Sequence, residues 1–362
     1  MNMTNKFGAF SLVATSALLS ACSTFQSQPA APEPAPAVVS TVTEAPPAVT
    51  AKMAAARQQL SQMVALQDRL YRVAGPLLIN NADLCRNQAR NLLGFTAQNK
   101  YSYPGEFAEA AHAALGYGDR LEVSSVLAGS GAARAGLRKG DDLIAAEGKP
   151  LPSGPSAEAE AGAVFGPLVA SRTTLNMTIG RDGANRAIPV PVTRACAFRV
   201  NLGNADNVNA YADGQHILVT RGMINFAQSD EAIAYVIARG MAHNILGHAA
   251  TQHATATLGS MVDNLNSVRP DLSLLIGSGG IRPMPADLDA AADSLALYLL
   301  VRAGYNIDGA GRFWQKLATV YPASVLNGYT ANHPATAARL AAIARTTGEI
   351  KSKQAGKKPL LP

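Results

Sequence analysis

Two groups of side chains in this sequence have the chemistry of metal ligands. His243, His248 and His253 follow one another at intervals of five residues, and Asp289 and Asp293 come later. Imidazoles and carboxylates are common zinc ligands. On one straight helix, however, each of these histidines is rotated by about 140° from the last, and the outer two are about 15 Å apart along the axis. The three histidines therefore cannot share one ion unless the helix breaks.

Arg239 precedes His243 by four residues, so the two side chains lie on one face of a helix. A guanidinium is planar, permanently charged and suited to bidentate contact with a carboxylate. Gly240 beside it leaves room for the arginine to reach across, although Gly inside a helix costs about 1 kcal/mol relative to Ala. The sequence therefore predicts an ion pair between Arg239 and Asp289 or Asp293.

The element that must position Arg239 and His243 is a helix that begins after Ser229. Ser229 can act as its N-cap, and Asp230 and Glu231 follow in the first turn. Its apolar positions are Ile233, Val236, Ile237, Met241 and Ile245. Residues 207–223 just before it read as a turn, a strand and the start of another helix.

The segments around these positions resemble zinc metallopeptidases of the HtpX and CAAX-prenyl-protease type, which are gluzincins. The matching segments are residues 207–223, 297–305, 313–317 and 333–339. The resemblance thus extends from about Asn207 almost to the C-terminus. In that family the strand within the first segment lies beside the substrate cleft.

The resemblance implies roles for five residues. The family has HExxH on its helix, where two histidines bind zinc and the glutamate activates water. Here Arg239 replaces the first histidine and Gly240 replaces the glutamate, while His243 is kept as the second histidine. The third ligand, a glutamate in the family, is Asp289, and Asp293 is kept as a supporting residue.

His248, His333 and Arg339 also match family positions, and the resemblance gives them supporting roles. Because the general base and one ligand are missing, the first hypothesis is a catalytically silent scaffold that binds peptides or protein partners without a cofactor. The alternative is an active zinc-dependent metalloendopeptidase of the periplasm, with His243, Asp289 and His333 as ligands, for which His333 must come within reach of the metal. A third possibility is a scaffold kept only as a tether or spacer.

An earlier region, residues 104–193, resembles a bacterial PDZ domain. The resemblance rests on residues 129–144, which contain the AGLxxGDxI pattern of that family. A strand at 121–126, a helix at 157–170, and strands at 175–181 and 187–192 around an Asp182-Gly183 turn fit the same fold. This part of the chain is therefore expected to be a small β-rich domain.

PDZ domains bind peptides by adding a strand to a sheet edge and holding the terminal carboxylate with backbone N–H groups. By resemblance, the loop that holds the carboxylate is Leu115-Gly116-Tyr117. Asp119 follows at once, and its charge would repel a ligand carboxylate. Peptide binding and a purely structural role both stay open for this domain.

The cysteines indicate an envelope protein. Lys6 precedes an apolar run, residues 7–19, that ends in Leu19-Ser20-Ala21-Cys22, which resembles a bacterial lipobox. Lipidation of Cys22 is therefore expected, and Ser23 after it favours the periplasmic face of the outer membrane. Cys85 and Cys196 have no CxxC partner and are expected to form a disulfide in an oxidising compartment.

Composition and segment boundaries complete the prediction. The chain has 362 residues, of which 48% are hydrophobic, and its basic residues are spread along it, so no nucleic-acid partner is expected. We predict a signal peptide (1–21), a Pro/Ala-rich tether (22–50), a helical segment (51–103) that breaks at Gly75-Pro76, a PDZ-like domain (104–195) and a mainly helical metallopeptidase-like domain with a small sheet (196–362). The fold class is α+β.

Overall fold

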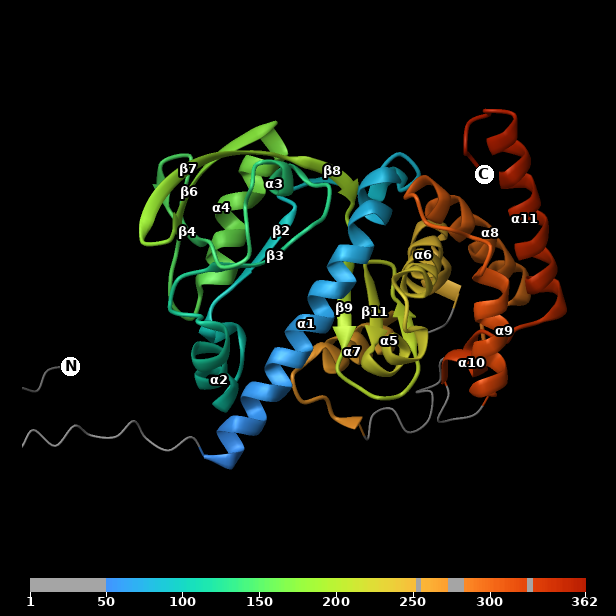
Figure 1. Cartoon of the computed structure of the whole chain (residues 1–362), viewed down its shortest axis with the longest axis horizontal. Helices are drawn as coiled ribbons and strands as arrows, with labels where there is room; N and C mark the ends of the chain where they lie inside the picture. Colours follow the sequence, from blue (N-terminus) through green and yellow to red (C-terminus); the bar gives the residue numbers. More distant parts are fainter. Residues whose placement is uncertain (1–49, 252–254, 273–282, 324–327) are drawn as a thin grey trace, which may run out of the picture. The chain divides into compact units, whose positions relative to one another are not determined.

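The computed structural model describes residues 50–251, 255–272, 283–323 and 328–362 (Figure 1). All of these described residues belong to one compact unit. The predicted signal peptide, Cys22 and nearly all of the predicted tether lie outside the described residues, as does His253. The described chain is mixed α and β: the sheets and four of the helices come before residue 221, and the described elements after it are helical.

The first element is the long helix α1 (Ala51–Asn80), which Thr50 caps by accepting a hydrogen bond from the N–H of Met53. The predicted break at Gly75-Pro76 is wrong, because Pro76 lies inside this helix. Proline removes only one N–H donor, and the helix continues because Leu77 and Leu78 on its next turn are buried in the core.

Two short strands, β1 (Ala89–Leu92) and β2 (Phe95–Gln98), follow α1. The predicted helical segment 51–103 is therefore helical only to Asn80, apart from short 3-10 turns at Arg86–Gln88 and Lys100–Ser102. Each strand has four residues, too few to show a clear alternation in the sequence. Strand β2 also places the start of the first sheet ahead of residue 104.

The first sheet has the strand order β2-β3-β4-β6-β7, with β5 paired to β4. Its further strands are β3 (Glu122–Val126), β4 (Asp142–Ala146), β5 (Lys149–Pro150), β6 (Thr174–Arg181) and β7 (Ala184–Pro191), and its helices are α2 (Glu106–Leu115), α3 (Gly131–Arg134) and α4 (Ala157–Ser171). The strands and helix predicted for residues 121–192 are thus present. Asp182 and Gly183 make the β6–β7 turn with positive φ values of 53° and 74°.

Strand β1 pairs antiparallel with β8 (Thr193–Cys196) at the base of this sheet. Cys85 and Cys196 form a buried disulfide there, with Cα atoms 5.6 Å apart. The bridge joins the end of α1 to the strand that leaves the first sheet. It therefore closes a loop that contains the whole sheet.

The second sheet has the order β10-β11-β9, made of β9 (Arg199–Gly203), β10 (Ala210–Ala212) and β11 (His216–Thr220). Strands β9 and β11 are parallel, and β10 is antiparallel to β11. The amide of Gln67 on α1 donates to the carbonyl of Val200 and accepts from the N–H of Leu202. The side chain of Gln67 therefore pairs with the open edge of β9.

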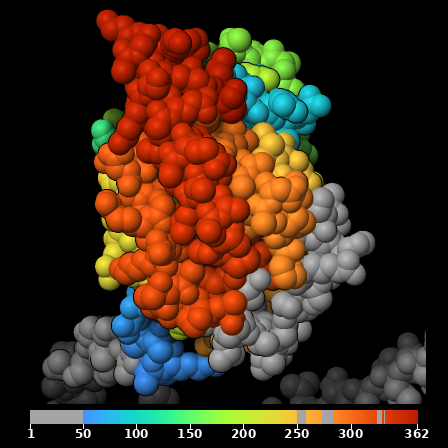
Figure 2. All heavy atoms as spheres, turned by 90° about the vertical axis from the view of Figure 1, so that its right-hand side faces the viewer, coloured from blue at the N-terminus to red at the C-terminus, as the bar shows by residue number. Residues whose placement is uncertain are grey.

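Helices make up the rest of the chain. They are α5 (Arg221–Ala227), α6 (Asp230–Leu246), α7 (Thr255–Asn266), α8 (Ala286–Arg302), α9 (Ala310–Val320), α10 (Gly328–Asn332) and α11 (Ala337–Ala355), with a 3-10 turn at His248–Thr251. Helix α8 packs against α6 and α11. The later helices, orange and red, make up most of the face seen in Figure 2. No helix among the described residues combines the length and apolar character needed to cross a membrane.

Candidate functional site

Helix α6 holds three of the residues that the sequence singles out. The hydroxyl of Ser229 caps it by accepting a hydrogen bond from the N–H of Ala232, as the sequence predicts. One face of α6 packs on strand β11, where a Cβ atom added to Gly240 would lie 2.8 Å from Cγ2 of Ile217. Gly240 is therefore what allows the helix and the strand to approach so closely.

Arg239 is buried, with 2% of its surface exposed, and points away from solvent. Its Nε donates to Oδ1 of Asp293 at 2.8 Å and its Nη2 donates to Oδ1 of Asp289 at 2.5 Å. The ion pairs expected from the sequence are thus present, with both aspartates at once. Because two different nitrogens of Arg239 bond to two different carboxylates, the orientation of the guanidinium is fixed.

Two aromatic residues that the sequence did not single out as site residues complete the surroundings of Arg239. Nη1 donates to the hydroxyl of Tyr329 at 2.8 Å. The guanidinium carbon lies 5.4 Å from the ring centre of Trp314 and 5.7 Å from that of Tyr329, within the range of cation–π attraction. Trp314 lies in one of the segments with a family resemblance, whereas nothing in the sequence pointed to Tyr329.

Asp293 is shared between two arginines. Nε of Arg339 donates to its Oδ2 at 2.7 Å, and Nη2 of Arg339 donates to its Oδ1 at 3.0 Å. Nη1 of Arg339 also donates to the carbonyls of His333 and Pro334. Two arginines thus balance the two buried aspartates, and Arg339 fixes the loop that carries His333.

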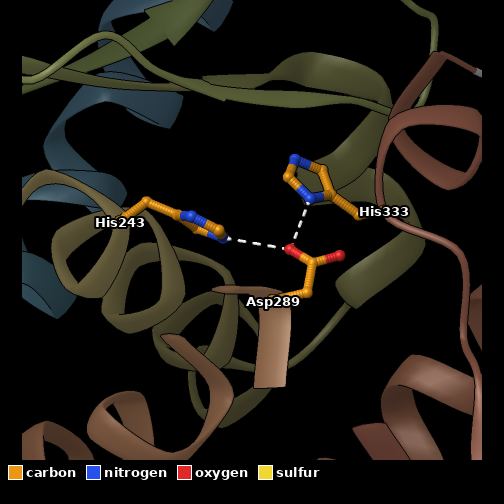
Figure 3. Close-up of side chains that lie close together, drawn as sticks. All are labelled: His243, Asp289 and His333. Carbon is orange, nitrogen blue, oxygen red and sulfur yellow. Dashed lines mark hydrogen bonds and ion pairs between the residues drawn. The ribbon is translucent and has the colours of Figure 1, made fainter. Parts of the chain in front are cut away.

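His243 and His333 both approach Asp289, as Figure 3 shows. Nδ1 of His333 lies 2.8 Å from Oδ1 of Asp289, and Nε2 of His243 lies 3.5 Å from the same oxygen. One ligand atom from each of these three residues lies within 4.8 Å of the others. His333, which the alternative hypothesis requires near the other ligands, is therefore beside them.

His248 also lies near His243, which the straight-helix argument did not predict. Helix α6 ends at Leu246, and Gly247 adopts the left-handed conformation with φ of 73°. The chain therefore turns, and Nδ1 of His248 comes within 3.1 Å of Nδ1 of His243.

Burial and the nearby arginine keep the histidines neutral. Loss of solvent, followed by the charge of Arg239, holds the pKa of His243 well below its usual value. The same two causes lower the pKa of His333 to about 4. Burial raises the pKa of Asp289. The charge of Arg239 and the hydrogen bond from His333 together lower it by more, so the net pKa is lowered. The site thus contains charged Arg–Asp pairs beside uncharged imidazoles.

The space next to these residues is small. A cavity of about 30 Å³ is lined by Arg239, Gly240, His243, His333 and residues 209–212 of β10 and the loop before it. That volume holds one or two water molecules. Cleavage of a peptide in this conformation would require the cavity to open.

The residues present do not fit a catalytic zinc ion as they are arranged here. His243, Asp289 and His333 are suitable donors, and within the part of the chain that the structure describes Nε2 of His243 and Oδ2 of Asp289 have no hydrogen-bond partner. However, the guanidinium of Arg239 already holds Oδ1 of Asp289, which both histidines face. A divalent cation added beside this charge would be repelled at close range in a medium of low dielectric constant.

The predicted carboxylate-binding loop is not placed to bind a peptide. Leu115 ends α2, Gly116 is its left-handed C-cap, and the Tyr117 side chain is buried and stacked on Tyr103. The next strand, β3, pairs with β2 on one edge and β4 on the other. Because neither edge is open, a peptide strand cannot add there. Asp119 instead pairs with Lys100 at 2.9 Å.

Replacing Arg239 with methionine tests the role of the buried charge. The variant leaves Asp289 buried without its closest cation, so we expect the free energy of unfolding to fall by roughly 3–5 kcal/mol. Arg221→Met is the matched control, because its partner Asp206 is 77% exposed, and we expect a loss below about 1 kcal/mol. Urea denaturation at neutral pH measures both, and equal small losses would show that the buried pair does not stabilise the fold.

The buried histidines predict loss of stability in mild acid. A histidine whose pKa is lower in the folded state binds fewer protons there than in the unfolded chain, so stability falls as the pH drops from its ordinary pKa of 6.5 toward about 4. For His333 the loss over that window is roughly 3 kcal/mol. Urea denaturation at pH 7.5 and pH 5 should show a smaller difference for His333→Asn than for the original protein. A histidine titrating near 6.5 by NMR at this position would contradict the expectation.

Comparison with known proteins finds a family similarity over part of the chain. Residues 178–347 match Peptidase family M48. No curated protein matches the chain. One solved structure that matches is the crystal structure of the HtrA3 PDZ domain bound to a phage-derived ligand (FGRWV), with 15% sequence identity, a TM-score of 0.23, and coverage of 29% of this chain and 88% of that chain. Over residues 178–347, the chain is therefore similar to metallopeptidases of family M48 and has a peptidase-like scaffold.

Proposed function

We propose that this protein uses its peptidase-like scaffold to bind peptides or protein partners and does not cleave them. The observation that carries the proposal is the buried guanidinium of Arg239, which bonds to Asp289, Asp293 and Tyr329. In the resemblance to gluzincins, Arg239 has the position of a zinc-binding histidine. The positive charge of Arg239 thus pairs with Asp289, where zinc would be in the family.

The absence of a general base at position 240 supports the same proposal. General acid–base catalysis contributes roughly 10²–10⁴-fold to an enzymatic rate. Gly240 has no side chain, and the cavity beside it is too small for a peptide in this conformation. Loss of the base and of one metal ligand together removes both means of activating water.

The second candidate is an active zinc-dependent metalloendopeptidase of the periplasm. In its favour, donor atoms of His243, Asp289 and His333 lie within 4.8 Å of one another. For zinc to bind, Arg239 would have to release Asp289 and move. Another group would also have to take the role of the base.

Metal content and casein cleavage distinguish the two candidates. We expect purified full-length protein to contain far less than one zinc per chain and to leave casein intact. Restoring the family residues with Arg239→His and Gly240→Glu should increase zinc uptake. Casein cleavage by the original protein, abolished by a chelator, would refute the silent-scaffold proposal.

The structure requires one addition to that experiment. A side chain at position 240 meets Ile217, so the double variant should be combined with Ile217→Ala to make room. The matched control is Ile217→Ala alone, which changes the packing but restores neither ligand nor base. Zinc uptake by the triple variant but not by this control would link the metal to the restored residues.

We also propose that lipid on Cys22 anchors the protein at the periplasmic face of the outer membrane. The proposal rests on the lipobox-like Leu19-Ser20-Ala21-Cys22. Cells grown with labelled palmitate should incorporate the label into the original protein and into Cys85→Ala, but not into Cys22→Ala. Label that persists in Cys22→Ala would rule out this anchor.

A further inference from the structure

A cavity of about 630 Å³ lies between helix α1, the first sheet, strand β9 and the end of helix α7. Small-molecule sites in proteins usually have volumes of about 300–1,000 Å³. More than half of the residues that line this cavity carry a hydroxyl or a carboxamide. The cavity is therefore large enough for a small ligand and offers it mainly uncharged hydrogen-bonding groups.

The first sheet presents a polar face to this cavity. Thr96 of β2 and Ser124 of β3 both line it, and their hydroxyls form a hydrogen bond with each other at 2.9 Å. Phe95, the residue before Thr96, packs instead against Phe165 of α4. Because successive side chains of a strand point to opposite faces of a sheet, this part of the cavity wall is the face turned away from α4.

Three polar groups in the lining have no hydrogen-bond partner within the described parts of the chain. They are the carboxamide of Asn201, the hydroxyl of Tyr71 and Nε2 of Gln98, whose Oε1 accepts from Tyr103. Burial raises the pKa of Tyr71, so its hydroxyl keeps its proton and can donate. Unpaired polar groups away from bulk water are destabilising, so these three favour a ligand that supplies donors and acceptors.

The charges around the cavity nearly cancel. Asp68 forms an ion pair with Lys139 at 2.6 Å. Glu158, Asp263 and Arg199 also line the cavity, and none of them forms an ion pair with another described residue. The two carboxylates and one guanidinium leave a single negative charge in excess. A strongly charged ligand would therefore find little opposite charge to meet it.

We propose that this cavity binds a short, uncharged oligosaccharide. Each sugar hydroxyl can donate and accept a hydrogen bond, which matches the unpaired carboxamides and the hydroxyl in the lining. The C–H faces of a sugar ring can pack on the ring of Tyr71 and on Val64, which also line the cavity. This ligand class differs from the peptides and proteins of the proposed function, and the inference does not depend on that function.

Isothermal titration calorimetry on the full-length protein tests the ligand class. The probes are chitotriose, cellotriose and maltotriose, which are uncharged trisaccharides, and spermidine, a cation that the excess negative charge could attract. We expect at least one trisaccharide to bind with a Kd of about 1 mM or lower. We expect no binding of spermidine under the same conditions.

Two variants in the lining locate the site. Asn201→Ala removes a carboxamide that has no partner elsewhere in the described chain, so it should weaken trisaccharide binding by roughly two- to tenfold. Its urea denaturation midpoint should stay close to that of the original protein. Asn266 is exposed at the end of α7 and lines the cavity, so Asn266→Trp should block binding.

Asn185 provides the matched control for both variants. It is an exposed asparagine on β7 and does not line the cavity, so Asn185→Ala and Asn185→Trp should bind the trisaccharide normally.

Each contrary outcome removes a defined part of the inference. Binding of spermidine alone would overturn the uncharged ligand class. Trisaccharide binding that Asn266→Trp leaves unchanged would overturn the cavity as the site. If none of the three trisaccharides binds, the inference fails, while the proposed binding of peptides or protein partners is unaffected.

Discussion

The balance of buried charge in the helical region constrains the rest of this structure. Arg239 on α6, Asp289 and Asp293 on α8, and Arg339 on α11 are all nearly inaccessible to solvent. Burying a single unpaired charge costs several kcal/mol, so these four groups are tolerable only together. Because they come from three helices, the pairing also determines how α6, α8 and α11 align.

The same balance decides the chemistry of the neighbouring histidines. With two arginines already neutralising two aspartates, a protonated imidazole or a divalent metal would add charge without a partner. His243 and His333 therefore remain neutral, although they lie within reach of Asp289. Next to Asp289, the side chain of Arg239 thus supplies a positive charge from within the protein.

Local signals in the sequence predicted much of this arrangement. The Ser229 cap and the spacing of Arg239 and His243 follow from helix periodicity, and the ion pair with Asp289 follows from the charges. The contact with Tyr329 could not be predicted, because it joins residues 90 positions apart through a five-residue helix. The fold of His248 back toward His243 depends on the left-handed conformation of Gly247, which a straight-helix argument ignores.

The predicted binding loop precedes a strand that is paired on both sides, and the sequence does not reveal which strand edges stay open. Strand β3, after the predicted loop, is paired on both edges, and β9 is covered by the side chain of Gln67. Edge strand β7 contains Pro189 and Pro191, which lack N–H donors, and edge strand β10 has only three residues. Strand β2 is four residues long, free of proline and beside an apolar groove. An open edge of that kind invites unwanted pairing unless another segment or chain covers it.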